Sequence, residues 1–238
     1  MVVNAETIAS APRLRISAVP FRLGRFGLQV AVRSGDPAGI RLLADSPEPD
    51  ERLDAAARRI VRGRIGSDEQ YLEQLYTFGH ATDPDRAVTV SYLALFRGVD
   101  DSSTRRPHIT WAMANDLALP SVVDRQVLDY ALLRLQAKLG YTNIAFHLLP
   151  VTFTLSELQL AYEAVLDHPV DKRNFRRRMM ASGILEQLAQ KRRDGSHRPA
   201  ALFRFASRDD HAAYLTPPWA AERPEGQDEE TSMVEDRT

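Results

Sequence analysis

Residues 13–98 consist of short apolar runs separated by turn-forming residues, which is the pattern of a sheet. LRISAVPFRL and FGLQVAVRS, within residues 13–34, alternate partly between apolar and polar positions and are separated by the turn-like Gly24-Arg25. The segments GIRLLAD, YLEQLYTFG and AVTVSYLALFRG follow, and the last has the continuous apolar character of a buried strand. We therefore predict five strands in this part of the chain.

Helical spacing of apolar residues occurs once among these strands and once after them. Residues Leu53, Ala56, Ala57, Ile60 and Val61 recur at i, i+3, i+4, i+7 and i+8, and Gly66 ends that segment. A second helix is expected from Val122 to Leu139, after the apolar stretch HITWAMA. Strands, a helix, more strands and a closing helix predict an α+β sandwich of about 140 residues, which we place at 13–150.

The pattern changes in a second unit, placed at 151–206. Thr154 and Glu157 have the spacing of a capping box, and the helix they open carries an apolar face that includes Leu158, Tyr162 and Val165. Pro169 separates that helix from a basic one, and the segments GILEQLA and AALFRF follow as short strands joined by the cationic turn QKRRDGSHRPA. Helix, turn, basic helix and a hairpin with a basic tip predict a winged helix-turn-helix.

The basic helix, VDKRNFRRRMMASG at 170–183, is the strongest candidate for DNA binding. Phe175, Met179 and Ser182 share one face, the cations lie opposite or beside it, and Gly183 suits a left-handed stop. Arginine and asparagine pair with guanine and adenine edges in the major groove. The candidate contacts are Lys172, Arg173, Asn174, Arg176 and Arg177 in the helix, and Lys191, Arg192, Arg193 and Arg198 in the wing. The alternative for such a charge run is a solvated surface.

Charge distribution favours the DNA-binding interpretation. The net charge is only −1, but residues 170–204 hold ten Lys/Arg against three Asp/Glu, whereas residues 206–238 hold three Arg against nine Asp/Glu. A basic stripe confined to one small module is typical of nucleic-acid binding. We expect residues 1–12 to form a flexible arm without a secretory signal, and the acidic tail at 207–238 to be disordered.

Composition narrows the chemistry further. The chain is 44% hydrophobic and 26% charged, as ordinary globular proteins are, and it has no cysteine. Disulfides, thiol catalysis and cysteine-ligated zinc are therefore excluded, and a reducing cytoplasmic location is expected. No apolar run is long enough for a membrane helix, and we expect neither a metal nor a cofactor.

Several of these motifs resemble one family. The segment FTLSELQLAYEAVLDHPVDKRNFRRRMMASGILEQL, with the RPA and LFRF segments after it, is similar to the winged-helix domain of the Nudix-related transcriptional regulators, the NrtR family. YLEQLYTFG and LGYTNIAFHLLP resemble the Nudix-like domain and linker of that family. The resemblance implies a Nudix-like sandwich followed by the winged helix, a homodimer formed mainly through the Nudix-like domain, and ADP-ribose or a related nucleotide or sugar as effector.

The resemblance breaks at the catalytic motif of Nudix hydrolases, G-x5-E-x7-R-E-U-x-E-E-x-G-U, where U is aliphatic. Aligned on Glu51, the motif's arginine, aliphatic residue and second glycine fall on Arg59, Val61 and Gly66. The three helix glutamates are replaced by Ile60, Gly63 and Arg64, the leading glycine by Asp45 and the last aliphatic by Ser67. Because Mg²⁺ needs oxygen ligands and Arg64 is itself a cation, we expect a Nudix fold without Nudix catalysis.

Arginines on this helix are candidates for ligand binding. The resemblance places the helix beside a nucleotide-diphosphate cleft, so Arg59, Arg62 and Arg64 are predicted to contact phosphate, although a solvated face is the more common meaning of such a row. We therefore expect a ligand-responsive transcriptional repressor that binds a palindromic DNA operator. The alternatives are a nucleoside diphosphate (ADP-ribose) hydrolase with an atypical metal site, and a ligand-free architectural or protein-binding module.

Overall fold

A computed structural model describes residues 12–35, 37, 39–79, 87–98, 106–140, 142–193 and 199–206. The predicted arm, apart from residue 12, and the predicted acidic tail lie outside the described residues, as does Arg198. The strands of the first unit are β1 (Arg13–Gly24), β2 (Gly27–Arg33), β3 (Arg41–Asp45), β4 (Tyr71–Gly79), β5 (Ala87–Phe96) and β6 (Ile109–Met113). Its helices are α1 (Leu53–Ile65) and α2 (Val122–Leu139).

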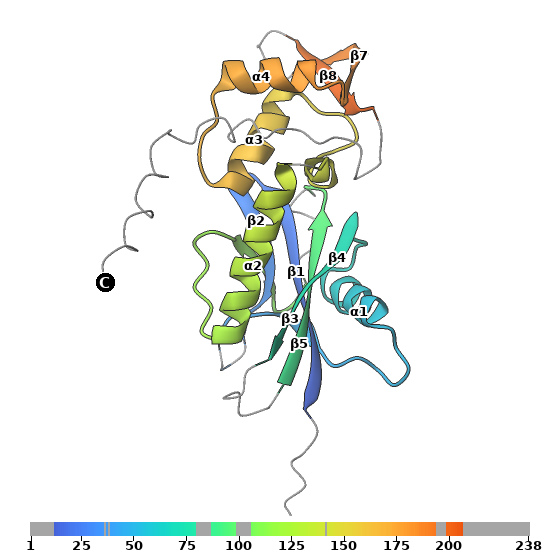
Figure 1. Cartoon of the computed structure of the whole chain (residues 1–238), viewed down its shortest axis with the longest axis vertical. Helices are drawn as coiled ribbons and strands as arrows, with labels where there is room; N and C mark the ends of the chain where they lie inside the picture. The colour runs from blue at the N-terminus through green and yellow to red at the C-terminus, as the bar shows by residue number, and fades with distance from the viewer. Residues whose placement is uncertain are drawn as a thin grey trace, which may run out of the picture.

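The six strands form one mixed sheet in the order β4-β5-β1-β3-β2-β6. β1 and β5 run parallel at its centre, in register from Arg13 opposite Ala87 to Arg22 opposite Phe96, and every other pairing is antiparallel. Helices α1 and α2 cover opposite faces of this sheet (Figure 1). The predicted α+β sandwich is therefore confirmed, with HITWAMA supplying the sixth strand.

Alternation along the central strands explains why both faces are covered. In β5, Val90 and Tyr92 belong to the core under α1, whereas Leu93 and Leu95 belong to the core under α2. β1 behaves in the same way, because successive side chains of a strand point to opposite faces. A strand buried on both faces is continuously apolar, which is the pattern seen in the sequence.

The start of α2 is fixed by a buried carboxylate. Asp124, which is 0% exposed, accepts hydrogen bonds from Arg15 Nη2 of β1 at 2.9 Å and Arg41 Nε of β3 at 2.8 Å. The backbone N–H of Leu42 donates a further bond of 3.2 Å to the same carboxylate. A buried charge is tolerated only when it is paired and hydrogen-bonded, so this cluster fixes α2 on the sheet.

The second unit contains α3 (Leu155–Leu166), α4 (Lys172–Ala181), β7 (Leu185–Arg192) and β8 (Ala200–Phe205). Its helices and the β7–β8 hairpin lie at one end of the sheet (Figure 1). The capping box of Thr154 and Glu157 is present, and Gly183 has the predicted left-handed conformation, with φ of 72°. One boundary was wrong: β7 continues through Lys191 and Arg192, which we had placed in the turn.

The two units share one hydrophobic core. The short helix η1 (Ile144–His147) connects them and is largely buried. The core cluster under α2 continues without a break into α3, α4 and β8, where it includes Tyr162, Phe175 and Phe203. The segment that we treated as a linker is therefore part of this core, so displacement of the second unit must disturb packing against the sheet. Among the described residues, no helix is long and apolar enough to cross a membrane.

Candidate effector pocket and DNA-binding surface

Two residues that this chain keeps from the Nudix motif, Glu51 and Arg59, connect the loop before α1 to that helix. Arg59 donates hydrogen bonds of 2.8 Å from Nε and Nη2 to the two carboxylate oxygens of Glu51, and its Nη2 also donates to the carbonyl oxygen of Ser46 at 3.0 Å. Hydrogen bonds from Arg59 and from the backbone N–H of Glu48 lower the pKa of Glu51 to about 2. The same pair raises the pKa of Arg59, so both groups are charged at neutral pH.

The positions that would carry metal ligands do not fit a divalent cation. Ile60 packs into the core under α1 and is 3% exposed, and Gly63 offers no side chain. Arg64 adds a positive charge at the third position. Mg²⁺ requires oxygen ligands in octahedral geometry, and the carboxylate of Glu51 is already engaged by Arg59.

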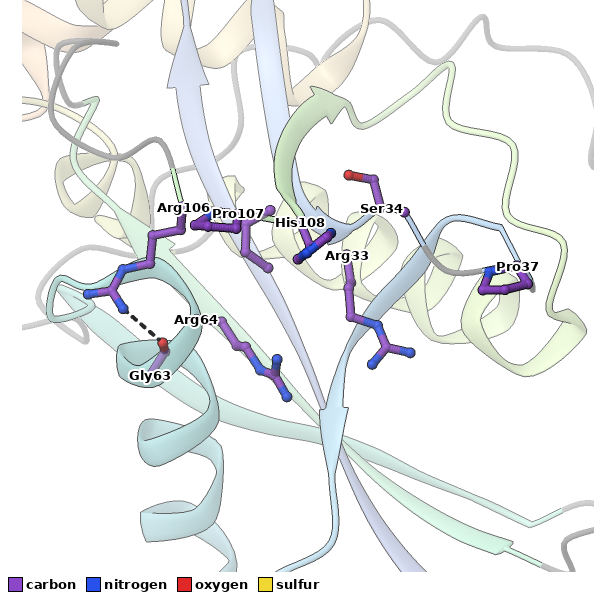
Figure 2. Close-up of a pocket in the computed structure, with 10 residues that line it drawn as sticks. Arg33, Ser34, Pro37, Gly63, Arg64, Arg106, Pro107 and His108 are labelled. Carbon is purple, nitrogen blue, oxygen red and sulfur yellow. Dashed lines mark hydrogen bonds between the residues drawn. The ribbon is translucent and has the colours of Figure 1, made fainter.

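A pocket of about 580 Å³ lies next to two of these positions, Gly63 and Arg64. It lies between the end of α1, the end of β2 and the segment that leads into β6, and Gly63 and Arg64 are part of its wall. Arg106 closes one side by donating a 3.2 Å hydrogen bond from Nη1 to the carbonyl oxygen of Gly63. Arg64 and Arg33 extend from α1 and β2 toward the same space (Figure 2). Its volume is within the range of small-molecule sites.

The lining of this pocket is strongly cationic. Arg33, Arg64 and Arg106 contribute three guanidinium groups, His108 lies beside them, and none of the described lining residues is acidic. Guanidinium groups bind phosphate oxygens through paired, charge-assisted hydrogen bonds. A Cβ atom built on Gly63 would meet nothing within 4 Å, so space remains next to these arginines. The arrangement is suited to an anionic ligand, with Arg64 supplying the positive charge that a metal would otherwise supply.

The structure separates the three arginines that we predicted to contact ligand. Arg64 lines the pocket, whereas Arg59 faces Glu51, and Arg62 Nε lies 2.5 Å from Asp68 Oδ1. Sequence reasoning missed Arg33, the last residue of β2, and Arg106 and His108, which precede β6. No local motif marks these three residues, because β2 and β6 bring them to the end of α1 only through the folded sheet.

The basic helix α4 has the predicted division between a buried and an exposed face. Phe175 and Met179 are 0% and 1% exposed, and the ring of Phe175 packs edge-on against Tyr162 of α3 at 5.1 Å. The Asp171 side chain caps the helix by accepting a 2.7 Å hydrogen bond from the backbone N–H of Asn174. Lys172, Arg173, Asn174 and Arg177 are exposed, and Arg176 is partly buried.

Three of these predicted contacts, Asn174, Arg176 and Arg177, make hydrogen bonds within the protein. Arg177 Nη2 donates a 2.9 Å hydrogen bond to Asn174 Oδ1, which orients both side chains on the exposed face. Arg176 Nη2 donates a 3.0 Å bond to the hydroxyl of Ser156, on the first turn of α3. Arg176 therefore faces α3 rather than solvent, whereas the other predicted contacts in the helix, Lys172, Arg173, Asn174 and Arg177, are exposed.

The cations of the wing also differ among themselves. Lys191 and Arg193 are exposed, whereas Arg192 is partly buried and its Nη2 lies 2.5 Å from Glu157 Oε1. Burial raises the pKa of Glu157, but the hydrogen bond from the Thr154 backbone and the contact with Arg192 outweigh it, so the pKa is lowered. The roles that we predicted for these side chains in DNA binding remain predictions.

The structure thus defines a winged-helix protein whose DNA-binding unit is fused to a Nudix-like sandwich. Residues 145–205 match the family described as the NrtR DNA-binding winged helix domain. The ADPR responsive transcriptional repressor NtrR of Acinetobacter baylyi is 39% identical over 168 residues, which cover 68% of this chain and 67% of that protein. The chain belongs to the NrtR family of transcriptional regulators.

Solved structures agree with this family assignment. NrtR of Shewanella oneidensis, crystallised in complex with a 27mer DNA, is 26% identical with a TM-score of 0.72, and the alignment covers 86% of this chain and 98% of that one. The same protein without DNA is 27% identical with a TM-score of 0.73 at the same coverage. A MutT/nudix family protein from Enterococcus faecalis shares the fold alone, at 18% identity and a TM-score of 0.63, over 85% of this chain and 89% of that one.

Proposed function

We propose that this protein represses transcription by binding operator DNA through α4 and the wing, and that an anionic nucleotide of the ADP-ribose class binds its cationic pocket and weakens that binding. The observation that carries the proposal is the replacement of metal ligands by a pocket with three arginines and no described acidic side chain. The similar protein from Acinetobacter baylyi is named as responsive to ADPR, a nucleotide with two phosphates. Three guanidinium groups supply paired donors for the oxygens of both phosphates.

The pocket supports binding without turnover. Hydrolysis of a diphosphate by the Nudix route needs a metal to activate water, and of the glutamates in the Nudix motif this chain keeps only Glu51, which is engaged by Arg59. A ligand that survives binding reports its own concentration through its different affinities for two protein states. The sheet separates the pocket from the DNA-binding unit, because the pocket adjoins the core under α1 whereas α3 packs on the core under α2, so an effect of the ligand on DNA binding passes through the strands.

Titration calorimetry with ADP-ribose in the presence of EDTA tests the pocket. We expect metal-free binding to the unmodified protein, and a loss of at least about tenfold in affinity for Arg64→Ala, since one charge-assisted contact contributes about 1.5–3 kcal/mol. Arg62→Ala is the matched control, because Arg62 is on the same helix but faces Asp68 outside the pocket. Equal effects of the two variants, or binding only with Mg²⁺, would contradict the assignment.

A DNA-binding measurement tests the response. Fluorescence anisotropy with a labelled duplex, selected from a random-sequence library by the protein itself, should show that ADP-ribose releases the DNA. The same concentration of ADP-ribose should leave Arg64→Ala bound to the duplex. If ADP-ribose binds the unmodified protein and DNA affinity stays constant, the pocket has no regulatory role.

A further inference from the structure

The first turn of α3 contacts both elements that we expect to touch DNA. Before this turn, Phe153 exchanges backbone hydrogen bonds of 2.9 and 2.8 Å with Phe203 of β8, which joins the wing hairpin to the chain entering α3. Ser156 then accepts a hydrogen bond from Arg176 of α4, and Glu157, the next residue, pairs with Arg192 of β7. Two adjacent side chains therefore hold one arginine from the recognition helix and one from the wing.

The side chain of Glu157 is held by hydrogen bonds that do not involve Arg192. Its Oε2 accepts a 2.7 Å hydrogen bond from the backbone N–H of Thr154 and a 3.0 Å bond from the Thr154 hydroxyl, while its Oε1 faces Arg192. The side chains of Arg192 and Glu157 are 35% and 34% exposed, so the pair is partly shielded from solvent. An ion pair whose acidic member is already held by two hydrogen bonds loses little further side-chain entropy.

We infer that Arg192 is a positioning residue, which holds the wing against the first turn of α3 at the separation from α4 that DNA binding requires. This inference rests on the proposed DNA-binding function. It replaces our prediction that Arg192 is a direct DNA contact like Lys191 and Arg193, which stay predicted contacts. Those two neighbours are exposed, whereas Arg192 has an acidic partner in the absence of DNA.

The two roles of Arg192 predict opposite effects for a change in its partner. If Arg192 contacts phosphate, Glu157 competes with DNA for it, and neutralising Glu157 leaves affinity unchanged or raises it. If Arg192 positions the wing, neutralising Glu157 releases the wing and lowers affinity. Glu157→Gln makes this comparison without removing the capping box, because glutamine is accepted at that position.

The experiment measures the affinity of the full-length protein for its selected duplex at several salt concentrations. We expect Glu157→Gln and Arg192→Gln to weaken binding by on the order of tenfold, because a displaced wing loses phosphate contacts. The double variant should bind no more weakly than Arg192→Gln alone, since both changes break one contact. Arg192→Lys should restore most of the affinity.

The salt dependence separates positioning from direct contact. Arg193→Gln is the matched control in the adjacent wing residue, and loss of one phosphate contact there should reduce the slope of log affinity against log salt by about 0.9. Glu157→Gln removes no cation, so affinity lost in that variant is assigned to wing position. Thermal unfolding of each variant checks that the fold is retained.

The outcomes distinguish this inference from the proposed function. Unchanged or tighter binding by Glu157→Gln, with additive effects in the double variant, would overturn the positioning role while leaving DNA binding intact. If Glu157→Gln does not fold, the test is Arg192→Lys: failure of this variant to restore DNA affinity would also overturn the positioning role. If the unmodified protein enriches no sequence from the library, the proposed function falls and the inference with it.

Discussion

Arg59 and Glu51 form a two-point ion pair, in which Nε and Nη2 of the arginine each donate a 2.8 Å hydrogen bond to a different carboxylate oxygen. These two residues keep the spacing of the Nudix motif although its metal ligands are gone. The pair joins the loop at residues 46–51 to the middle of α1, so it has a structural use that is independent of catalysis. This explains why Glu51 and Arg59 are present although the metal-binding glutamates of the motif are absent.

The pair makes stability depend on pH. Because the pKa of Glu51 is lowered from 4.5 to about 2 in the folded protein, its contribution is fully present above pH 4.5 and is lost as pH falls toward 2. We expect Glu51→Gln to lower the thermal midpoint at neutral pH, and the difference from the unmodified protein to shrink below pH 4.5. Glu48→Gln is the control, because Glu48 lies 3.7 Å from Arg59 and is mostly exposed. A pH-independent difference would contradict the pairing.

The exposed face of α4 is expected to determine DNA affinity. Arg173→Ala with Arg177→Ala removes two exposed cations, and loss of Arg177 also frees Asn174, so operator binding should be abolished in a gel-shift assay. Arginine contacts to bases contribute about 1–3 kcal/mol of discrimination each. Thermal stability should hold, because Phe175 and Met179 carry the packing of this helix.

A control with the same change in net charge tests whether the effect is local. Arg52→Ala with Arg62→Ala removes two exposed arginines from the sandwich, and we expect it to retain DNA binding. If the α4 variant shifts DNA at the same protein concentration as the unmodified chain, α4 is not the recognition helix.

The elements that could be predicted are those specified by local pattern. Thr154 and Glu157 are three residues apart and cap one helix, so their sequence spacing contains the whole interaction. The apolar face of α1 and the continuous apolar run of β5 likewise specified what each element buries. Gly183 ended α4 as predicted, because few other residues adopt a positive φ without strain.

The pocket and the shared core could not be predicted in this way. Arg33 and Arg64 are 31 positions apart, and they meet only because the sheet places the end of β2 near the end of α1. The row of arginines on α1 also did not reveal which of them faces an acidic neighbour, since Asp68 and Glu51 reach Arg62 and Arg59 from the loops at either end of that helix. Tertiary contacts, which sequence periodicity does not report, decide these partners.

A two-fold dimer is expected for the intact protein. One winged helix contacts a short stretch of DNA, and a symmetric pair placed about one helical turn apart doubles the contacts on a palindrome. Light scattering at micromolar concentration should therefore give about twice the chain mass of 26.7 kDa. A stable monomer that saturates its duplex one-to-one would contradict this expectation.

The unmodified protein is expected to lack Mg²⁺-dependent hydrolysis of ADP-ribose. Gly63 and Arg64 line the pocket where motif glutamates would bind metal, and an arginine there repels a divalent cation. Gly63→Glu with Arg64→Glu should therefore weaken metal-free ADP-ribose binding by at least about tenfold, through loss of one contact and gain of two negative charges.

Ile60, at the first of the three helix glutamate positions, limits how far a metal site can be restored. Ile60 is 3% exposed within the core under α1, so Ile60→Glu would bury a carboxylate and destabilise the fold rather than add a ligand. The double variant at Gly63 and Arg64 is consequently the informative one, and its gain in Mg²⁺ affinity is measurable by calorimetry. Product release from ADP-ribose by the unmodified protein, abolished by EDTA, would instead establish an enzyme with a metal site built from other residues.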